Sequence, residues 1–376
     1  MQTAEVLIIG GGVMGCSIAF HLARRGIKSV VVERDAIGSH ASSAAAGMLG
    51  AQVEMDEPGP LTEFCLQSRS MFPALQAELL ERTGVDIELN RAGLLKVARF
   101  DEDVKRLRER QAWQTAYGQT ARWLEPEECL ALEPSLHPEV RGGLYLPEDW
   151  QVSAPKLTQA LASAAKRLGA NLVEGTEVRA IEHSPDGTWH VDTAQGHWIA
   201  DWIVITAGVW SQSIAQKLGW HLPMTPVKGE SLALRPKQPL FSRTLYGPEC
   251  YLVPKANGEI IVGATERDGA WDEEVTAEAV QRLLQSAFNL VPRLRDSLHT
   301  RSWAGLRPGT QNRFPYVGQL GDENRAVIAT GHYRNGILLS AATGDAVARL
   351  LLGEPAPELA AFAPMSQAEV QKWEEG

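Results

Sequence analysis

The first part of the chain alternates between apolar runs and helical periodicity. Residues 5–9 form an apolar run of strand length. In residues 13–23 the apolar positions fall largely on one side of a helix, and Gly26 suits the position just after a helix end. Residues 29–32 form a second apolar run. This order of elements predicts the first β-α-β unit of an α/β sheet.

Three glycines separate the first predicted strand from the helix. Gly10, Gly12 and Gly15 have G-x-G-x-x-G spacing, which permits a tight turn, a close backbone approach to a pyrophosphate, and close packing of helix on strand. Glu33 lies 18 positions after Gly15, where a carboxylate can accept from ribose hydroxyls. A glycine-rich turn alone is weak evidence, but here strand, glycines, helix, strand and acid occur in order. They predict dinucleotide binding, without distinguishing NAD from FAD.

The same α/β pattern returns later in the chain. Residues 154–182 predict a helix followed by strands, and residues 189–193 and 197–208 predict a pair of strands. Residues 326–353 predict a strand, a glycine-containing turn and a helix. At 376 residues the chain also exceeds the usual size of one core. We therefore predict a discontinuous nucleotide-binding domain of residues 1–85, 146–222 and 300–376, and a substrate-binding domain of residues 86–145 and 223–299.

The predicted second domain contains a hairpin candidate. Residues 248–266 place Asn257-Gly258 between two apolar runs, which favours a two-residue type I′ turn. Pro254 lies in the first run and predicts an edge or bulged strand, because proline cannot donate to a central ladder. Tyr251 lies in the same run, and its spacing alone fits a half-buried strand tyrosine.

The segment WAGLRPGT, at 303–310, contains one charged residue, Arg307, in apolar surroundings. Pro308 restricts the backbone of Arg307 to extended geometry. A charge buried without a partner is costly, so Arg307 is expected either to form an ion pair or to bind an anionic ligand. The segment itself leaves both alternatives open.

Composition and charge exclude several classes of protein. The net charge of −10, from 36 basic and 46 acidic residues, argues against a nucleic-acid-binding surface. No apolar run reaches the length of a membrane span, and no leader pattern is evident, so we expect a cytoplasmic protein without a membrane partner. The four cysteines, Cys16, Cys65, Cys129 and Cys250, lack metal-ligand spacing and predict free thiols and no metal.

Several segments together resemble a known family. The resemblance is to the FAD-dependent glycine/D-amino-acid oxidase superfamily, most closely to its ThiO-type glycine oxidases, and runs from residue 5 to about residue 355. It implies an α/β (α+β overall) fold: a Rossmann-like FAD-binding domain plus an antiparallel-sheet substrate domain that covers the isoalloxazine ring. The segments that carry it are GGGVMG at 10–15, SSAAAGMLG at 42–50, VITAGVWS at 204–211, CYLVP at 250–254, GEIIVGAT at 258–265, WAGLRPGT at 303–310 and GHYRNGILL at 331–339.

The resemblance also implies an activity. Glycine and similar small amines, such as sarcosine or small D-amino acids, would be oxidised to the imine by hydride transfer to flavin N5. Hydrolysis would give glyoxylate and ammonia, and molecular oxygen would be reduced to hydrogen peroxide. The implied role is in thiamine thiazole biosynthesis, and the family's tetramers imply a homo-oligomer.

Site residues follow from the same resemblance. Tyr251 and Arg307 would hold the substrate carboxylate, with Arg334 nearby in the site. No general base stands out, so the substrate amine would lose its proton to solvent. Cofactor contacts would come from Gly10, Gly12, Val13, Met14, Gly15, Glu33, Arg34, Ser42, Ser43, Ala46, Gly47, Met48, Val178, Ala207, Gly208, Trp210, His332, Arg334, Asn335, Gly336, Ile337 and Leu338.

The chain departs from related patterns in three places. Residues 259–265 lack the lysine that monomeric sarcosine oxidases use for oxygen reactivity, and residues 307–316 lack the cysteine that attaches their FAD. We therefore expect noncovalent FAD. Glu249 and Glu266 replace a histidine and a methionine of glycine oxidases. They are either solvated acids or residues that change substrate preference.

Two alternatives remain open at this point. One is a D-amino-acid or sarcosine-type oxidase or dehydrogenase on the same scaffold, with the same carboxylate clamp and a different side-chain pocket. The other is a flavin-binding scaffold partner without activity, although Tyr251 and Arg307 argue against it. Bleaching of the flavin by small amines without oxygen would distinguish an enzyme from a scaffold.

Overall fold

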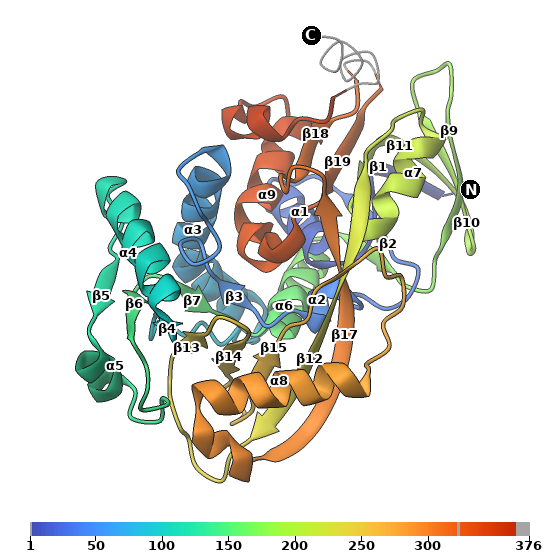
Figure 1. Cartoon of the computed structure of the whole chain (residues 1–376). Helices are drawn as coiled ribbons and strands as arrows, with labels where there is room; N and C mark the ends of the chain where they lie inside the picture. The colour runs from blue at the N-terminus through green and yellow to red at the C-terminus, as the bar shows by residue number, and fades with distance from the viewer. Residues whose placement is uncertain (1, 322–323, 366–376) are drawn as a thin grey trace.

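Two large sheets form the frame of the protein (Figure 1). The computed structural model describes residues 2–321 and 324–365. Over these residues, one sheet has eight strands, the second has nine, and β3 (Met48–Leu49) pairs with β7 (Trp150–Gln151). In the part of the chain so described, no helix is both long and apolar enough to span a bilayer.

The first sheet is largely parallel, as the β-α-β pattern predicts. Its strand order is β18-β19-β11-β1-β2-β8, and β1, β2, β8, β11 and β19 run parallel, while β10 and β9 extend from β11 as an antiparallel pair. The ends of β1 and β2 are buried without alternation, as expected for strands covered on both faces. The strands are β1 (Gln2–Ile9), β2 (Ser29–Val32), β8 (Asn171–Val173), β9 (Val178–His183), β10 (Trp189–Thr193), β11 (Gly196–Ile205), β18 (Tyr316–Gln319) and β19 (Ala326–Thr330).

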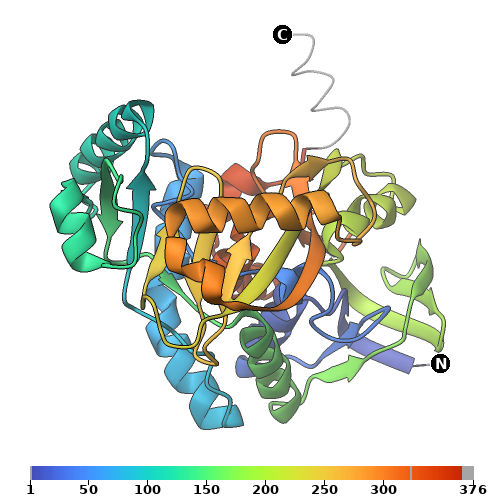
Figure 2. The same ribbon diagram turned by 60° about the horizontal axis from the view of Figure 1, so that its bottom comes forward.

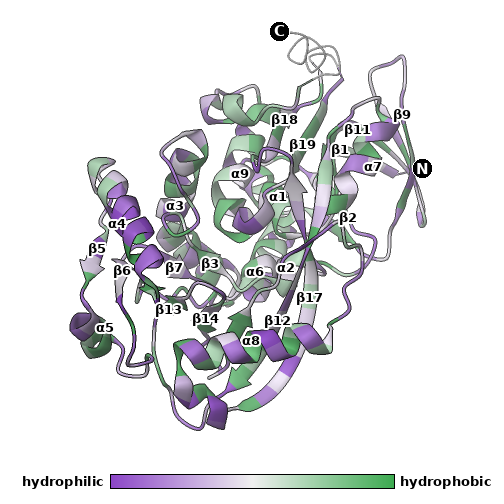
Figure 3. Cartoon of the chain, in the orientation of Figure 1, coloured by the Kyte–Doolittle hydropathy of each residue, from purple (hydrophilic) through white to green (hydrophobic). Residues whose placement is uncertain are grey.

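Helices from both ends of the chain pack together on this sheet. They are α1 (Val13–Arg24), α3 (Pro60–Thr83), α6 (Ala154–Arg167) and α9 (Gly336–Leu351), whose apolar faces share one core (Figures 1 and 3). Where α1 meets α9, the Ser17 hydroxyl donates to the Ser340 carbonyl at 2.7 Å. A Cβ on Gly344 would come within 2.2 Å of the Ser17 Oγ, so this contact depends on a glycine.

The second sheet is mostly antiparallel. Its order is β16-β12-β15-β14-β13-β4-β6-β5, and β17 pairs along β12. Short helices α4 (Asp101–Ala116) and α5 (Pro126–Leu132) lie beside its far end. The strands are β4 (Leu94–Ala98), β5 (Arg122–Leu124), β6 (Gly142–Leu146), β12 (Met224–Arg235), β13 (Thr244–Tyr246), β14 (Tyr251–Pro254), β15 (Ile260–Gly263), β16 (Arg267–Asp268) and β17 (Leu298–Thr310).

One face of the second sheet is covered by α8 (Ala277–Leu290), which lies across the strands (Figure 2). Leu232 and Leu252 pack with Leu283 of this helix. Neighbouring positions such as Tyr251 and Val253 belong to a separate cluster on the opposite face. The strand alternation therefore leaves that opposite face for the candidate site.

The hairpin differs from its prediction in two respects. β14 pairs with both β13 and β15, so it is not an edge strand. Pro254 is its last residue, where the missing N–H affects only the end of the ladder. The Gly258 N–H donates to the Lys255 carbonyl at 2.9 Å, and of Asn257 and Gly258 only the glycine has a positive φ, +82°. This geometry is a longer bulged turn, not a type I′ turn.

The segment of residues 50–56, which follows β3, is held by a buried charge network. Asp149 is fully buried and accepts from the backbone N–H groups of Gln52 and Val53, the latter at 2.7 Å. Arg69 of α3 pairs with Asp149 at 2.9 Å, and Arg110 of α4 donates to the Gln52 and Val53 carbonyls. Burial raises the pKa of Asp149 to about 6, against the effect of Arg69. The network therefore holds the backbone of residues 50–56 in place.

Replacing Arg69 tests the strength of this network. Arg69→Met should lower the free energy of unfolding by about 3–5 kcal/mol, because it leaves Asp149 buried without its partner. Arg108→Met is the matched control, since Arg108 and Glu125 form an exposed pair and should contribute less than about 1 kcal/mol. Urea unfolding followed by tryptophan fluorescence measures both. Equal losses in the two variants would contradict the role of the network.

Candidate active site

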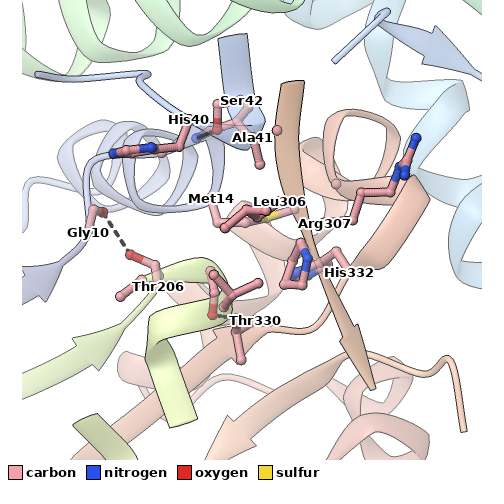
Figure 4. Close-up of a pocket in the computed structure, with 18 of the residues that line it drawn as sticks. Gly10, Met14, His40, Ala41, Ser42, Thr206, Leu306, Arg307, Thr330 and His332 are labelled. Atoms are coloured by element: carbon pink, nitrogen blue, oxygen red, sulfur yellow. Dashed lines mark hydrogen bonds between the residues drawn. The ribbon is translucent and has the colours of Figure 1, made fainter. Parts of the chain in front are cut away.

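A cavity of about 350 Å³ lies between the first sheet and the inner face of the second. Its walls come from the C-terminal ends of β1, β2, β11 and β19 and from β12, β14 and β17. Ligands of open α/β sheets bind at this end of the parallel strands. Figure 4 shows Gly10 and Thr206 at one end of the cavity and Arg307 at the other.

The glycine turn after β1 has the geometry of a phosphate-binding turn. Gly10 has φ +112°, and a Cβ there would meet the Thr206 carbonyl oxygen at 2.7 Å. A Cβ on Gly15 would come within 2.0 Å of the Gly10 carbonyl oxygen, so this glycine permits the helix to pack on the strand. Gly12 caps α1 without a side-chain hydrogen bond. The N-terminus of α1 meets the cavity here, where the Ser42 hydroxyl accepts from the Val13 N–H at 2.9 Å, and helix N-termini of this kind bind pyrophosphate.

The end of β2 supplies a carboxylate to the same part of the cavity. Glu33 accepts from the Gly11 N–H at 2.6 Å and from the Asp35 N–H at 2.9 Å. The Arg34 guanidinium lies 4.5 Å from the centre of the Trp210 ring. This end of the cavity combines an acid, a cation and an aromatic ring near the glycine turn, as expected for an adenosine site.

The small-residue loop that contains α2 (Ala41–Ala44) and leads to β3 lies tightly against the second sheet. A Cβ on Gly305 of β17 would come within 2.5 Å of the Ala44 Cβ. The Trp303 indole N–H donates to the Ala44 carbonyl at 2.9 Å, and the Lys255 ammonium donates to the Ala46 carbonyl at 2.6 Å. Backbone thus lies close to the cavity with few side chains in between, which suits a flat ligand.

Tyr251 and Arg307 both face the cavity from the second sheet. Each lies over a glycine: a Cβ on Gly263 would meet the Tyr251 hydroxyl at 2.4 Å, and one on Gly229 would meet the Arg307 guanidinium at 2.4 Å. Arg307 donates to the Thr265 carbonyl at 3.2 Å. Across the described residues, no carboxylate lies within 4.0 Å of its guanidinium and no group bonds the Tyr251 hydroxyl. Arg307 is therefore not the structural ion pair that the sequence left open.

Arg334 lines the same cavity, but four of its five N–H donors are engaged. Its Nε and Nη2 donate to Glu54 at 2.8 and 3.1 Å, Nη2 also donates to the Tyr246 hydroxyl at 2.8 Å, and Nη1 pairs with Glu266. Burial would raise the pKa of Glu54, but the charge and hydrogen bonds of Arg334, with Lys96, lower it below its usual value. Glu54 is thus held ionised.

His332 lies at the start of the turn that leads into α9. Its side chain is buried, and its Nε2 lies 3.2 Å from the Thr343 Oγ. Burial lowers its pKa to about 3, so the imidazole is neutral at physiological pH. Gly336 and Ile337 bring the N-terminus of α9 to the cavity beside it.

Most residues named from the sequence line this cavity. Those outside its lining are Gly15, which packs helix on strand, and Ser43, Asn335 and Leu338, whose contact with a cofactor stays a prediction. Glu249 and Glu266 are also outside: both are exposed, Glu249 bonds Ser286 of α8, and Glu266 pairs with Arg334. The lining residues among those named are Gly10, Gly12, Val13, Met14, Glu33, Arg34, Ser42, Ala46, Gly47, Met48, Val178, Ala207, Gly208, Trp210, Tyr251, Arg307, His332, Arg334, Gly336 and Ile337.

Sequence reasoning missed several lining residues. Glu54 follows the small-residue loop as the first of three closely spaced acids, with Asp56 and Glu57, and this pattern does not single it out. Thr206 is the residue before the predicted Ala207 and donates to the Gly10 carbonyl at 2.8 Å. Tyr246 lies behind the lining, where its hydroxyl bonds Arg334 and Glu54 and its ring lies beside Tyr251, and nothing in its local sequence indicates this.

Comparison with known proteins agrees with this geometry. A family model described as FAD dependent oxidoreductase (DAO) matches residues 5–350. The chain belongs to this family. It is thus an FAD-dependent oxidoreductase, and the cofactor fits the residues present: the glycine turn, the Glu33 carboxylate, and the side-chain-poor wall at Ala44 and Gly305.

Individual relatives match along most of their length. The chain is 43% identical over 362 residues to a glycine oxidase of Geobacillus kaustophilus, covering 95% of this chain and 96% of the relative. The crystal structure of glycine oxidase from Geobacillus kaustophilus superposes with a TM-score of 0.95 at 41% identity, covering 97% of this chain and 99% of that one. A bifunctional ThiO/ThiG protein of Synechocystis is 36% identical over 96% of this chain, which spans 54% of that longer protein.

The buried His332 makes stability depend on pH. The imidazole is charged below about pH 6.5 in the unfolded chain but only below about pH 3 in the folded one, so stability present above pH 6.5 is lost as the pH falls. Between pH 7 and pH 5, this group should remove about 2 kcal/mol of the free energy of unfolding. His332→Gln should show a correspondingly smaller pH dependence in urea unfolding with saturating FAD. Identical pH profiles for both proteins would contradict this.

Proposed function

We propose that the protein oxidises glycine and similarly small amines to the imine, giving glyoxylate, ammonia and hydrogen peroxide, with molecular oxygen as acceptor. The glycine oxidase relatives support the substrate class. The observation that carries the proposal is the Arg307 guanidinium, which lacks a carboxylate partner among the described residues and lies on the cavity wall with the Tyr251 hydroxyl.

FAD, when bound, supplies the acceptor for the hydride and returns the electrons to oxygen. The chain's contribution to its binding comes from three parts of the cavity. The glycine turn and the N-terminus of α1 would hold the pyrophosphate, and Glu33 would accept from the ribose. The N-terminus of α9, at Gly336, would favour negative charge on the ring system.

Arg307 and Tyr251 act by binding and orienting the substrate. A guanidinium can donate two parallel hydrogen bonds to a carboxylate, and a phenol adds a third donor. Fixing the carboxylate leaves the adjacent Cα–H bond of a small amino acid few orientations in a cavity of this size. This is a positioning effect, which can supply a large part of a rate enhancement.

The amine proton leaves to solvent in this proposal. Hydride loss from carbon requires a neutral amine. Glu54, the lining carboxylate on which Arg307 also acts, is held ionised by Arg334, so its lowered pKa makes it a poor base. His332, although neutral, is buried against Thr343.

Further parts of the proposal concern the organisation of the protein. We assign residues 1–85, 146–222 and 300–376 to an FAD-binding domain and residues 86–145 and 223–299 to a substrate-binding domain, with β17 crossing the boundary at residue 300. The ThiO/ThiG relative supports a role in thiazole formation for thiamine. The four buried free cysteines fit a reducing cytoplasm, and we expect a homo-oligomer.

Arg307→Met tests the clamp. The variant should keep its yellow FAD and lose about 100-fold or more in kcat/KM for glycine, because a charged partner of the carboxylate is gone. Arg282→Met, at an exposed position of α8, is the control and should leave turnover unchanged. The assay is peroxide formation with glycine, sarcosine and D-alanine, with anaerobic bleaching of the flavin by glycine. If none of these small amines bleaches the flavin of the wild-type protein, the proposed function is wrong.

The flavin should be held without a covalent bond. All four cysteines are free and buried, and none lines the cavity. Precipitation of the protein with acid should therefore release essentially all of the flavin into the supernatant. Colour that remains in the washed precipitate would show a covalent link.

A further inference from the structure

Two of the arginines that line the cavity, Arg307 and Arg334, have opposite hydrogen-bonding states. Arg307 has most of its donors free. A guanidinium has five N–H donors, and Arg334 uses four of them, on Glu54, Tyr246 and Glu266. A carboxylate brought into the cavity therefore finds one open binding position, at Arg307, and one filled position, at Arg334.

The two acids on Arg334 occupy different environments. The Glu54 side chain is 12% exposed and belongs to the segment anchored by Asp149 and Arg110, so it holds the guanidinium in place from the protein side. The Glu266 side chain is 47% exposed and contacts Nη1, the nitrogen that Glu54 does not use. Removing the Glu266 carboxylate would thus free the Nη1 donors without releasing Arg334 from Glu54.

Lys96, a further cation beside this cluster, is itself engaged. Lys96 donates to the Val53 carbonyl at 3.2 Å, and its ammonium lies 4.8 Å from the centre of the Tyr246 ring. Tyr246 in turn lies next to Tyr251, with ring centres 6.0 Å apart. The Arg334 cluster is therefore adjacent to the clamp, separated from it by two tyrosine rings tilted at 49° to each other.

We propose that Glu266 is a specificity-determining residue, which by occupying Arg334 restricts the enzyme to amines with a single carboxylate. The inference rests on the proposed function, since it takes the first carboxylate to be bound by Arg307. An amine with a second carboxylate would bring that group toward Arg334. There the Nη1 donor already pairs with Glu266, and the negative charge of Glu266 repels the incoming carboxylate. Sarcosine, with an N-methyl group, and glycine, with a hydrogen in its place, have no second carboxylate and avoid this repulsion.

Iminodiacetate and sarcosine are the probes that isolate this effect. Both are N-substituted glycines, one with a carboxymethyl group and the other with a methyl group. Oxidation of iminodiacetate with one water and one oxygen molecule gives glycine, glyoxylate and hydrogen peroxide, so initial peroxide rates report on it as on the other substrates. Rates are expressed per bound FAD.

Glu266→Ala should raise the ratio of kcat/KM for iminodiacetate to that for sarcosine by on the order of tenfold, the effect of one charge-assisted hydrogen bond. Glu266→Gln should raise the ratio by less, because its amide oxygen can still accept from Nη1 although the negative charge is gone. Glu249→Gln is the matched control, because Glu249 is exposed and bonds Ser286 outside the cavity. Its ratio should equal that of the wild type.

The outcomes separate the inference from the proposed function. An unchanged ratio in both Glu266 variants, with glycine still oxidised, overturns the inference and leaves the function standing. Equal loss of glycine, sarcosine and iminodiacetate turnover in these variants also overturns it, because Glu266 would then act on every substrate alike. A wild-type protein that oxidises none of the three overturns the proposed function instead.

Discussion

The contact between the small-residue loop and β17 is the constraint on which the site depends. Ala44 and Gly305 approach so closely that a single added carbon would not fit, and the Trp303 indole and Lys255 ammonium fasten the loop to the second sheet. This contact joins the two sheets beside the cavity. The phosphate-binding turn belongs to one sheet and the carboxylate clamp to the other, so their relative position is set here.

Glycines shape the clamp as much as the residues that bind. Gly229 and Gly263 lie beneath Arg307 and Tyr251 on neighbouring strands, and each leaves the space that a side chain would otherwise fill. The opposite face of these strands packs against α8 with ordinary apolar residues. One face of the sheet thus packs in an apolar core, and the other face presents the donors of Arg307 and Tyr251 above glycines.

The sequence predicts best what depends on local spacing. The turn at Gly10 and Gly15, the strand pair around it and the helix at 13–23 follow from neighbouring residues, and the structure agrees. The cluster around Arg334 could not be predicted this way, because Glu54 lies 280 positions away in sequence. The prediction that β14 is an edge strand was wrong because of the position of its proline. Pro254 does exclude a central ladder position, but as the last residue of β14 it removes only a terminal bond.

The packing of α1 on α9 has a consequence for synthesis on the ribosome. The first glycines of the cavity emerge among the earliest residues, whereas Gly336 and Ile337, which close it, follow more than three hundred residues later. Until α9 reaches Ser17 and covers α1, the first sheet lacks a large part of its core. The complete flavin site therefore cannot form before α9 has been made, and until then the face of α1 that α9 covers lacks its partner.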